Sequence, residues 1–123
     1  MLFRSGTTGL PKGVIHRHAS LQATFDAYAS HVLHVGREDR CLSVAKLFFA
    51  YGLGNSLTFP FGAGATAILE PRRPTPQIVL DDVRLEQPTL FFASPGFLAA
   101  LLDSDAPDDA FASVRATVTA GEA

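Results

Sequence analysis

The chain has 123 residues, which is long enough for one modest core and too short for two independent domains. Of these residues 47% are hydrophobic and 18% are charged, a composition typical of a soluble protein. The formal net charge of −2 argues against the broad basic field that nucleic acid or an anionic membrane attracts, so any anion recognition has to be local. No long unbroken apolar run and no signal-peptide pattern is present. The single cysteine, Cys41, lies in an apolar run, which predicts a core residue and a reducing, cytoplasmic setting.

The spacing of apolar residues alternates along the chain between strand-like and helix-like patterns. Strands are expected at residues 13–15, 41–45, 65–69, 89–93 and 114–119. Helices are expected from residue 20 to a stop at Gly36 and at residues 52–61, 76–86 and 95–102, and the first of them carries an apolar face made by Leu21, Phe25, Tyr28 and Val32. Strands separated by such helices predict an α/β fold with a mostly parallel sheet.

Two of these elements have clear boundary signals. Thr75 and Pro76 predict a helix start, with a hydroxyl cap and a proline in the first turn, and Pro88 predicts its stop. Ile78, Val79 and Val83 should face inward from this helix. The apolar run at residues 89–93 is bounded by prolines and predicts a strand that is covered on both faces.

Residues 5–13 read Ser-Gly-Thr-Thr-Gly-Leu-Pro-Lys-Gly, a segment rich in glycine and hydroxyl side chains. Glycines let backbone N–H groups approach a ligand, hydroxyls add donors for phosphate oxygens, and Lys12 adds one charge on a flexible stem. The segment is not a Walker loop, because Pro11 precedes the lysine and Gly13 follows it. Composition alone leaves a flexible surface turn open as an alternative.

Residues 45–55 are an aromatic cluster followed by two glycines, which is able to line an apolar slot around a flat ligand. For Phe48 and Leu53 we expect ordinary core packing instead. The hydroxyl of Tyr51 needs a hydrogen-bond partner.

The order of residues 5–13 resembles the phosphate loop of the adenylate-forming superfamily, which includes acyl-CoA synthetases, luciferases and peptide-synthetase adenylation domains. Residues 46–55, Lys-Leu-Phe-Phe-Ala-Tyr-Gly-Leu-Gly-Asn, look like the acyl-pocket motif of the benzoate–CoA ligase branch. Residues 121–123 resemble the stretch that borders adenine and the acyl pocket in this superfamily. The chain departs from the pattern at Arg4, where the family usually has Ser or Thr.

The resemblance implies an acid–thiol ligase that uses ATP, Mg²⁺ and coenzyme A to convert an aromatic carboxylate to an acyl-adenylate and then to an acyl-CoA. It implies catalytic roles at the phosphates for Thr7, Thr8 and Lys12, with Ser5, Gly6 and Gly9 completing the nucleotide-binding loop. It further implies that the aryl acid is held by Ala50, Tyr51, Gly52 and Gly121, and that the adenylate is bordered by Gly121, Glu122 and Ala123.

The resemblance also implies that residues 1–123 are part of the large N-terminal domain, truncated at both ends, with the magnesium ligand and the C-terminal lid domain beyond them. Such a piece is expected to be inactive alone. Two alternatives stay open, an aliphatic acyl-CoA synthetase or peptide-synthetase adenylation domain, and a non-catalytic nucleotide-binding fragment. No metal site is assigned to the histidine pairs His16/His18 and His31/His34, because neither has a third ligand nearby. Arg72 and Arg73 are expected to be loop charges, and the oligomeric state is left open.

Overall fold

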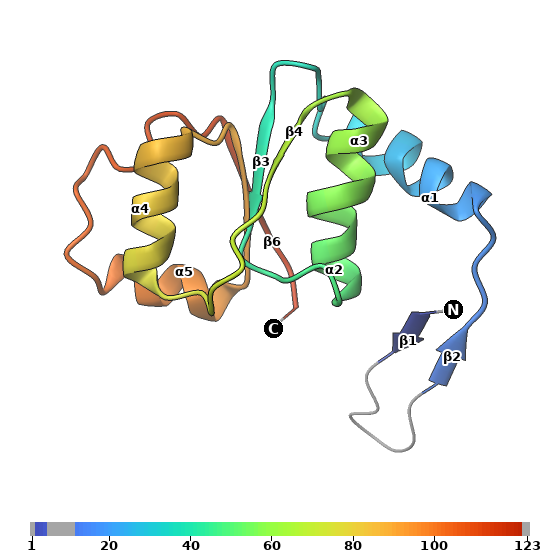
Figure 1. Cartoon of the computed structure of the whole chain (residues 1–123), viewed down its shortest axis with the longest axis horizontal. Helices are drawn as coiled ribbons and strands as arrows, with labels where there is room; N and C mark the ends of the chain where they lie inside the picture. The colour runs from blue at the N-terminus through green and yellow to red at the C-terminus, as the bar shows by residue number, and fades with distance from the viewer. Residues whose placement is uncertain (1, 5–11, 122–123) are drawn as a thin grey trace.

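A computed structural model describes residues 2–4 and 12–121 of the chain. A four-stranded parallel sheet lies at its centre (Figure 1). Its strands are, in spatial order, β4 (Thr66–Ile68), β3 (Arg40–Ser43), β5 (Leu90–Ala93) and β6 (Ala116–Thr119). The register places Cys41 opposite Leu90 and Phe91 opposite Thr117. The predicted α/β fold with a mostly parallel sheet is confirmed.

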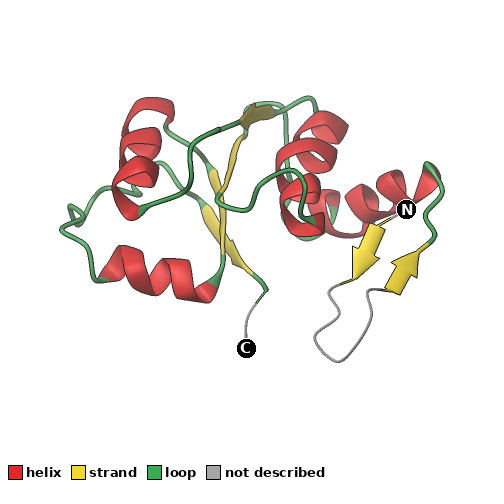
Figure 2. Ribbon diagram, turned by 60° about the horizontal axis from the view of Figure 1, so that its bottom comes forward, coloured by secondary structure: helices red, strands yellow, loops and turns green. Residues whose placement is uncertain are grey.

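Helices cover both faces of this sheet (Figures 1 and 2). One face is covered by α1 (Ala19–Thr24), η1 (Phe25–Ser30), α2 (Ala50–Leu53), η2 (Gly54–Thr58) and α3 (Phe59–Ala63). The other face is covered by α4 (Pro76–Glu86) and α5 (Pro95–Leu102). A separate antiparallel hairpin of β1 (Leu2–Arg4) and β2 (Lys12–Val14) precedes the first helix.

The hydrophobic core has two halves, one on each face of the sheet. Cys41, Leu90 and Phe92 belong to the half beneath η1 and α3, whereas their strand neighbours Leu42 and Phe91 belong to the half beneath α4 and α5. All four residues of β5 are buried, which confirms the prediction of a strand covered on both faces. Cys41 is also buried, as predicted, and burial raises the pKa of its thiol to about 12.

The bounds of α4 and α5 follow from their caps. The Thr75 hydroxyl accepts a hydrogen bond from the Ile78 N–H at 3.3 Å, and the Ser94 hydroxyl accepts one from the Phe97 N–H at 3.3 Å. Val79 and Val83 on α4 are buried. Both predicted helices are confirmed with the bounds expected from the sequence.

The predicted apolar face of the first helix is right in part. Phe25 and Tyr28 pack against the core and their neighbour Ala29 is buried. Leu21 and Val32, however, are 47% and 58% exposed, and Leu33 is buried instead. The helix changes at Phe25 from α to π geometry and ends at Ser30, before Gly36. A π turn holds one residue more than an α turn, so the buried face shifts along the sequence. The second helix has a π segment as well, at η2.

Charged side chains hold the amino-terminal ends of the central strands together. The Arg115 guanidinium donates to both carboxylate oxygens of Asp39, at 2.9 and 2.7 Å, and to the Leu33 carbonyl at 3.0 Å. The Thr89 hydroxyl donates to the same carboxylate at 2.6 Å. These contacts, led by that of Arg115, lower the pKa of Asp39 to about 2 although burial opposes them.

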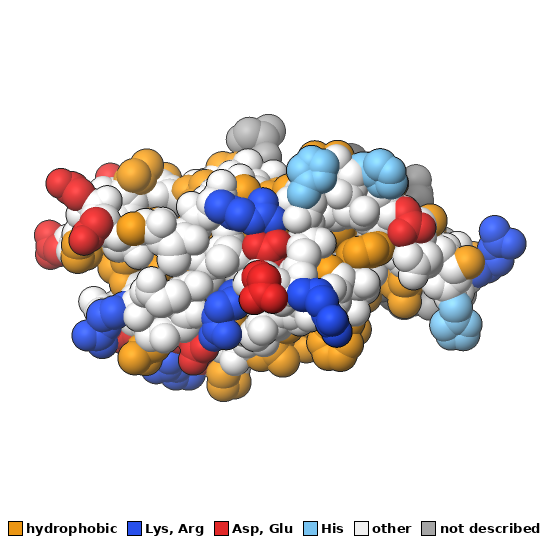
Figure 3. All heavy atoms as spheres, turned by 90° about the horizontal axis from the view of Figure 1, so that it is seen from above, with side chains coloured by type: hydrophobic (Ala, Val, Ile, Leu, Met, Phe, Trp, Pro, Cys, Tyr) orange, Lys and Arg blue, Asp and Glu red, His pale blue; other side chains and the backbone are white. Residues whose placement is uncertain are grey.

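Acidic and basic side chains are interspersed on the face that Figure 3 shows, without one broad basic field. Over residues 2–4 and 12–121, no helix combines the length and apolar character required to cross a bilayer.

Candidate functional site

A cavity of about 780 Å³ lies beyond the carboxyl edge of the parallel sheet. Every one of the four strands contributes to it through the segment that follows the strand. The lining residues are Val44, Ala45, Lys46, Phe48, Phe49 and Tyr51 after β3, Pro71, Arg73 and Pro74 after β4, Ser94 after β5, and Ala120 and Gly121 after β6. Ligands of open α/β sheets bind at this edge.

The strand order adds a second indication that this edge is a binding site. The chain passes from β3 to β4 on one side of the sheet and then crosses to β5 on the other side of β3. Such a reversal leaves a crevice between the two central strands at their carboxyl ends. The residues that line the cavity after β3 and β5 surround this crevice.

Two phenylalanine rings form the apolar wall of the cavity. Phe48 is 80% exposed and Phe49 is 56% exposed, and their ring centroids are 4.5 Å apart. The prediction of core packing for Phe48 is therefore wrong, because the β3–α2 loop carries this ring past the end of the sheet. Leu53, by contrast, is half-buried in α2 and does not line the cavity. Exposed neighbouring rings at the mouth of a cavity suit a flat apolar ligand.

Tyr51 connects the cavity to the core. Its ring packs against the core half beneath η1 and α3 and also lines the cavity. Its hydroxyl donates to the Val118 carbonyl at 2.9 Å, which supplies the predicted hydrogen-bond partner. Burial raises the pKa of this phenol to about 12, so Tyr51 is a neutral hydrogen-bond donor at physiological pH.

Gly52 and Ala50, the neighbours of Tyr51, have different surroundings. A Cβ atom at Gly52 would lie 2.1 Å from the Lys46 carbonyl oxygen and 2.4 Å from that of Ala45. Glycine is required there because the helix backbone approaches the β3–α2 loop. Ala50 is exposed at the first turn of α2, and neither residue is among those that line the cavity. Their assignment to an aryl acid stays a prediction.

Gly121 lies in the cavity wall beside Ala120. Its φ of +103° is a conformation that favours glycine, and among the described residues other than its chain neighbours no atom lies within 4 Å of the position that a Cβ would take. The other predicted nucleotide residues, Ser5, Gly6, Thr7, Thr8, Gly9, Glu122 and Ala123, lie outside the described residues. For Lys12 the structure describes the backbone, as the first residue of β2, but not the side chain.

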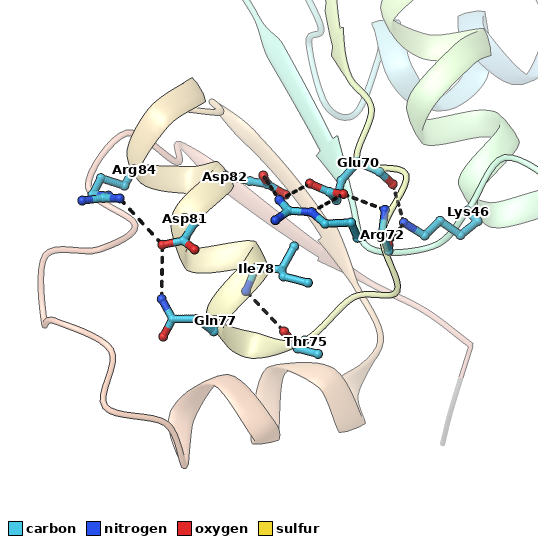
Figure 4. Close-up of polar contacts among 9 residues, drawn as sticks. All are labelled: Lys46, Glu70, Arg72, Thr75, Gln77, Ile78, Asp81, Asp82 and Arg84. Atoms are coloured by element: carbon cyan, nitrogen blue, oxygen red, sulfur yellow. Dashed lines mark hydrogen bonds and ion pairs between the residues drawn. The ribbon is translucent and has the colours of Figure 1, made fainter.

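Sequence reasoning missed the contribution of the β4–α4 segment. The Lys46 ammonium donates to the Glu70 carbonyl and, at 2.5 Å, to the Arg72 carbonyl (Figure 4). Arg72 is a loop charge, as expected, paired with Glu70 at 2.6 Å, and this pairing lowers the pKa of Glu70 to about 2. Arg73, expected to be a second loop charge, lines the cavity. The sequence did carry one indication of this role, because the segment follows the strand predicted at residues 65–69 and ligands bind beyond the carboxyl ends of such strands.

The whole chain, residues 1–123, matches the family model described as AMP-binding enzyme. The chain therefore belongs to the AMP-binding enzyme family, and the predicted relationship to adenylate-forming enzymes is confirmed.

Its relatives include aromatic acid–CoA ligases. The chain is 46% identical over 123 residues to benzoate–CoA ligase of Thauera aromatica, covering 99% of this chain and 23% of that protein. It is 50% identical over 100 residues to 4-hydroxybenzoate–CoA/benzoate–CoA ligase of Rhodopseudomonas palustris, covering 81% of this chain and 18% of that protein. A crystal structure of a benzoate CoA ligase from Burkholderia xenovorans LB400 superposes with a TM-score of 0.87 at 45% identity, covering 92% of this chain and 23% of that one. The chain thus spans about a quarter or less of the length of these relatives.

Proposed function

We propose that the protein takes part in the ATP-dependent activation of an aromatic carboxylic acid and its transfer to coenzyme A. The observation that carries this proposal is the cavity at the carboxyl edge of the sheet, with two exposed phenylalanine rings and the ring of Tyr51 in its wall. The names of the relatives, which are benzoate and hydroxybenzoate CoA ligases, support the same substrate class.

The proposed chemistry has two half-reactions. The carboxylate of the acid attacks the α-phosphorus of ATP, which forms an acyl-adenylate and releases pyrophosphate. The thiol of coenzyme A then attacks the acyl carbon and releases AMP. Positioning of the reactants and neutralisation of charge supply most of the catalysis in such reactions.

We assign the phosphates of ATP to the loop at residues 5–13, with Thr7, Thr8 and Lys12 as the groups that contact them. Mg²⁺ would accompany the nucleotide, and no magnesium ligand is assigned to this chain. We assign the adenylate to the edge of the cavity at Gly121, where no described side chain lies within 4 Å of the position of a Cβ. Tyr51, with its neighbours Ala50 and Gly52, is assigned to the aryl acid.

Binding of the acid is tested on the 123-residue chain itself. Saturation-transfer NMR and calorimetry with benzoate, 4-hydroxybenzoate and hexanoate should show binding of both aromatic acids at least about tenfold tighter than that of hexanoate, because only a flat ring stacks on the exposed phenylalanines. Equal binding of all three acids would remove the support for an aromatic substrate and favour an aliphatic one.

Catalysis is tested in a chimera, because the chain covers 23% of the benzoate–CoA ligase of Thauera aromatica. Residues 1–123 replace the aligned segment of the Thauera aromatica benzoate–CoA ligase, and benzoate-dependent pyrophosphate exchange is measured. We expect exchange in the chimera and a loss of about a hundredfold or more with Lys12→Ala. An inactive chimera that folds, or ATP binding that is identical in wild type and Lys12→Ala, would favour a non-catalytic role.

A further inference from the structure

We infer that Lys46 is a positioning residue of the cavity, whose ammonium holds the segment at residues 70–74 in the place where it forms a wall. The inference concerns how the cavity is built, and it rests on the proposed function only in taking the ligand to be an aromatic acid. A positioning residue acts through the groups it holds, so Lys46 is not assigned to the reacting atoms.

The backbone of Lys46 is fixed on two sides. Its carbonyl accepts a hydrogen bond from the Phe49 N–H at 3.0 Å. The backbone of α2 packs against the same carbonyl at Gly52, where a Cβ atom would lie only 2.1 Å from the oxygen. The side chain therefore extends from a backbone that is held in place on both sides.

The ammonium bonds to the two peptide carbonyls that flank Pro71. Lys46 donates to the Glu70 carbonyl and to the Arg72 carbonyl, the latter at 2.5 Å (Figure 4). Pro71 lies between these two residues and lines the cavity, and Arg73 and Pro74 follow it in the same wall. One side chain from the β3–α2 loop thus fixes the peptides on both sides of a wall residue. Carbonyls engage two of the three donors of the ammonium, so we assign Lys46 to the wall rather than to a ligand.

Other polar contacts shape the segment without joining it to the β3–α2 loop. The Glu70 carboxylate accepts from the Arg72 backbone N–H at 2.6 Å and from its guanidinium at 2.8 and 2.6 Å. The same guanidinium lies 3.7 Å from the Asp82 carboxylate on α4. These contacts fold the segment on itself and against α4. Among the described residues, the hydrogen bonds that join the segment at residues 70–74 to the loop carrying Phe48 and Phe49 are those of Lys46.

A second cavity, of about 460 Å³, adjoins the first. Both cavities are lined by Ala45, Lys46, Phe48 and Pro71. The stem of Lys46 and the ring of Pro71 therefore belong to the partition between two spaces. Without the tether, the segment at residues 70–74 keeps its contacts to α4 but loses its hydrogen bonds to the β3–α2 loop, and the two spaces can merge.

The tether is tested with Lys46→Met, which keeps an unbranched stem and removes the ammonium. Its matched control is Arg84→Met, which removes a cation from α4 whose side chain is 75% exposed and lies 3.8 Å from the Asp81 carboxylate. Amide hydrogen exchange at Glu70, Arg72 and Arg73 is measured by NMR without ligand. We expect exchange to rise by about fivefold or more in Lys46→Met and to stay within about twofold in Arg84→Met.

Ligand selection is measured on the same three proteins with benzoate and the larger 2-naphthoate. In Lys46→Met, benzoate should bind about tenfold more weakly while 2-naphthoate changes less, because merged cavities favour the larger ring. A general loss of stability would weaken the binding of both acids to the same extent. If the wild type binds neither acid, the proposed substrate is wrong. The exchange experiment still tests whether Lys46 holds the segment at residues 70–74.

Unchanged exchange at residues 70–73 in a folded Lys46→Met variant would overturn the inference. If that variant does not fold, the mobility of the Lys46 ammonium group is measured by NMR in the wild type instead. The chain has two lysines, Lys12 and Lys46, so their signals can be told apart. A restricted Lys46 ammonium is expected from two carbonyl partners. A freely rotating ammonium with the mobility of an exposed lysine would overturn the inference.

Discussion

Tyr51 joins the two elements between which the cavity opens, α2 and the end of β6. Its hydroxyl bonds to the Val118 carbonyl while its ring faces the cavity. The two parts of this side chain have different roles. The hydroxyl stabilises the fold through its hydrogen bond, and the ring forms part of the cavity wall. Substitutions that remove one part at a time distinguish them.

Tyr51→Phe should lower the free energy of unfolding by about 1 kcal/mol, because a partly buried carbonyl loses its donor. The ring remains, so the dissociation constant for benzoate should change by less than about twofold. Tyr51→Ala removes the ring and should raise the dissociation constant for benzoate by about tenfold or more. Urea unfolding and calorimetry measure the two quantities. A tenfold loss of benzoate binding in Tyr51→Phe would show instead that the hydroxyl contacts the ligand.

The candidate site could be predicted in part at the level of single residues. Tyr51 and Gly121 were predicted from motifs, and both line the cavity. Lys46 and Arg73 were missed, because their positions depend on how a loop after one strand packs on a loop after another. Phe48 was misassigned for a related reason, since a large apolar side chain is usually a core residue unless the strand before it has already ended.

At the scale of elements, α2 is pressed against the β3–α2 loop at one glycine. Gly52 faces the carbonyls of Ala45 and Lys46, whereas the nearest atoms to a Cβ at Gly54, two residues on, are those of the Phe59 ring at 3.5 Å. Both glycines have helical surroundings. The pair therefore separates the effect of close packing from the effect of helix propensity.

Gly52→Ala should destabilise the protein by about 3 kcal/mol, because a methyl group is forced against backbone that cannot rotate away. Gly54→Ala should be neutral or stabilising by up to about 1 kcal/mol, because alanine favours the helix and meets an ordinary contact. Thermal unfolding of the two variants measures the difference. Equal stability of both variants would mean that α2 does not lie against the loop.

Elements with local signals were predicted well. The bounds of α4 and α5 follow from a hydroxyl cap and a proline that lie within three residues of each helix start. The π segments η1 and η2 left no such local signal. The expected apolar face of the first helix was therefore right at Phe25 and Tyr28 and wrong at Leu21 and Val32. The parallel sheet was predicted from the alternation of elements, but its strand order depends on packing between distant segments.

At the scale of the whole molecule, Asp39 gathers segments that are far apart in the chain. Its carboxylate accepts from Arg115, Thr89 and, at 2.9 Å, the Gly36 N–H. The folded-state pKa of about 2 lies below the ordinary value of 3.8, so the unfolded chain takes up a proton first as the pH falls. The stabilisation is complete above about pH 4 and is lost as the pH falls toward 2.

Asp39→Asn should therefore lower the free energy of unfolding by about 2 kcal/mol at pH 6, and the gap to wild type should shrink between pH 4 and pH 2. Urea unfolding of both proteins across this range measures the gap, and the difference cancels the titration of the other carboxylates. A gap that stays constant down to pH 2 would show that the Asp39 carboxylate has an ordinary pKa in the folded protein.

In the part of the chain that the structure describes, the residues that line the cavity follow the strands in sequence rather than lie within them. Changes of chemical preference during evolution thus need not disturb the framework. Among family members that accept different acids, positions such as 48, 49 and 73 should diverge early, while the interior positions 41, 42 and 90–93 keep their apolar character.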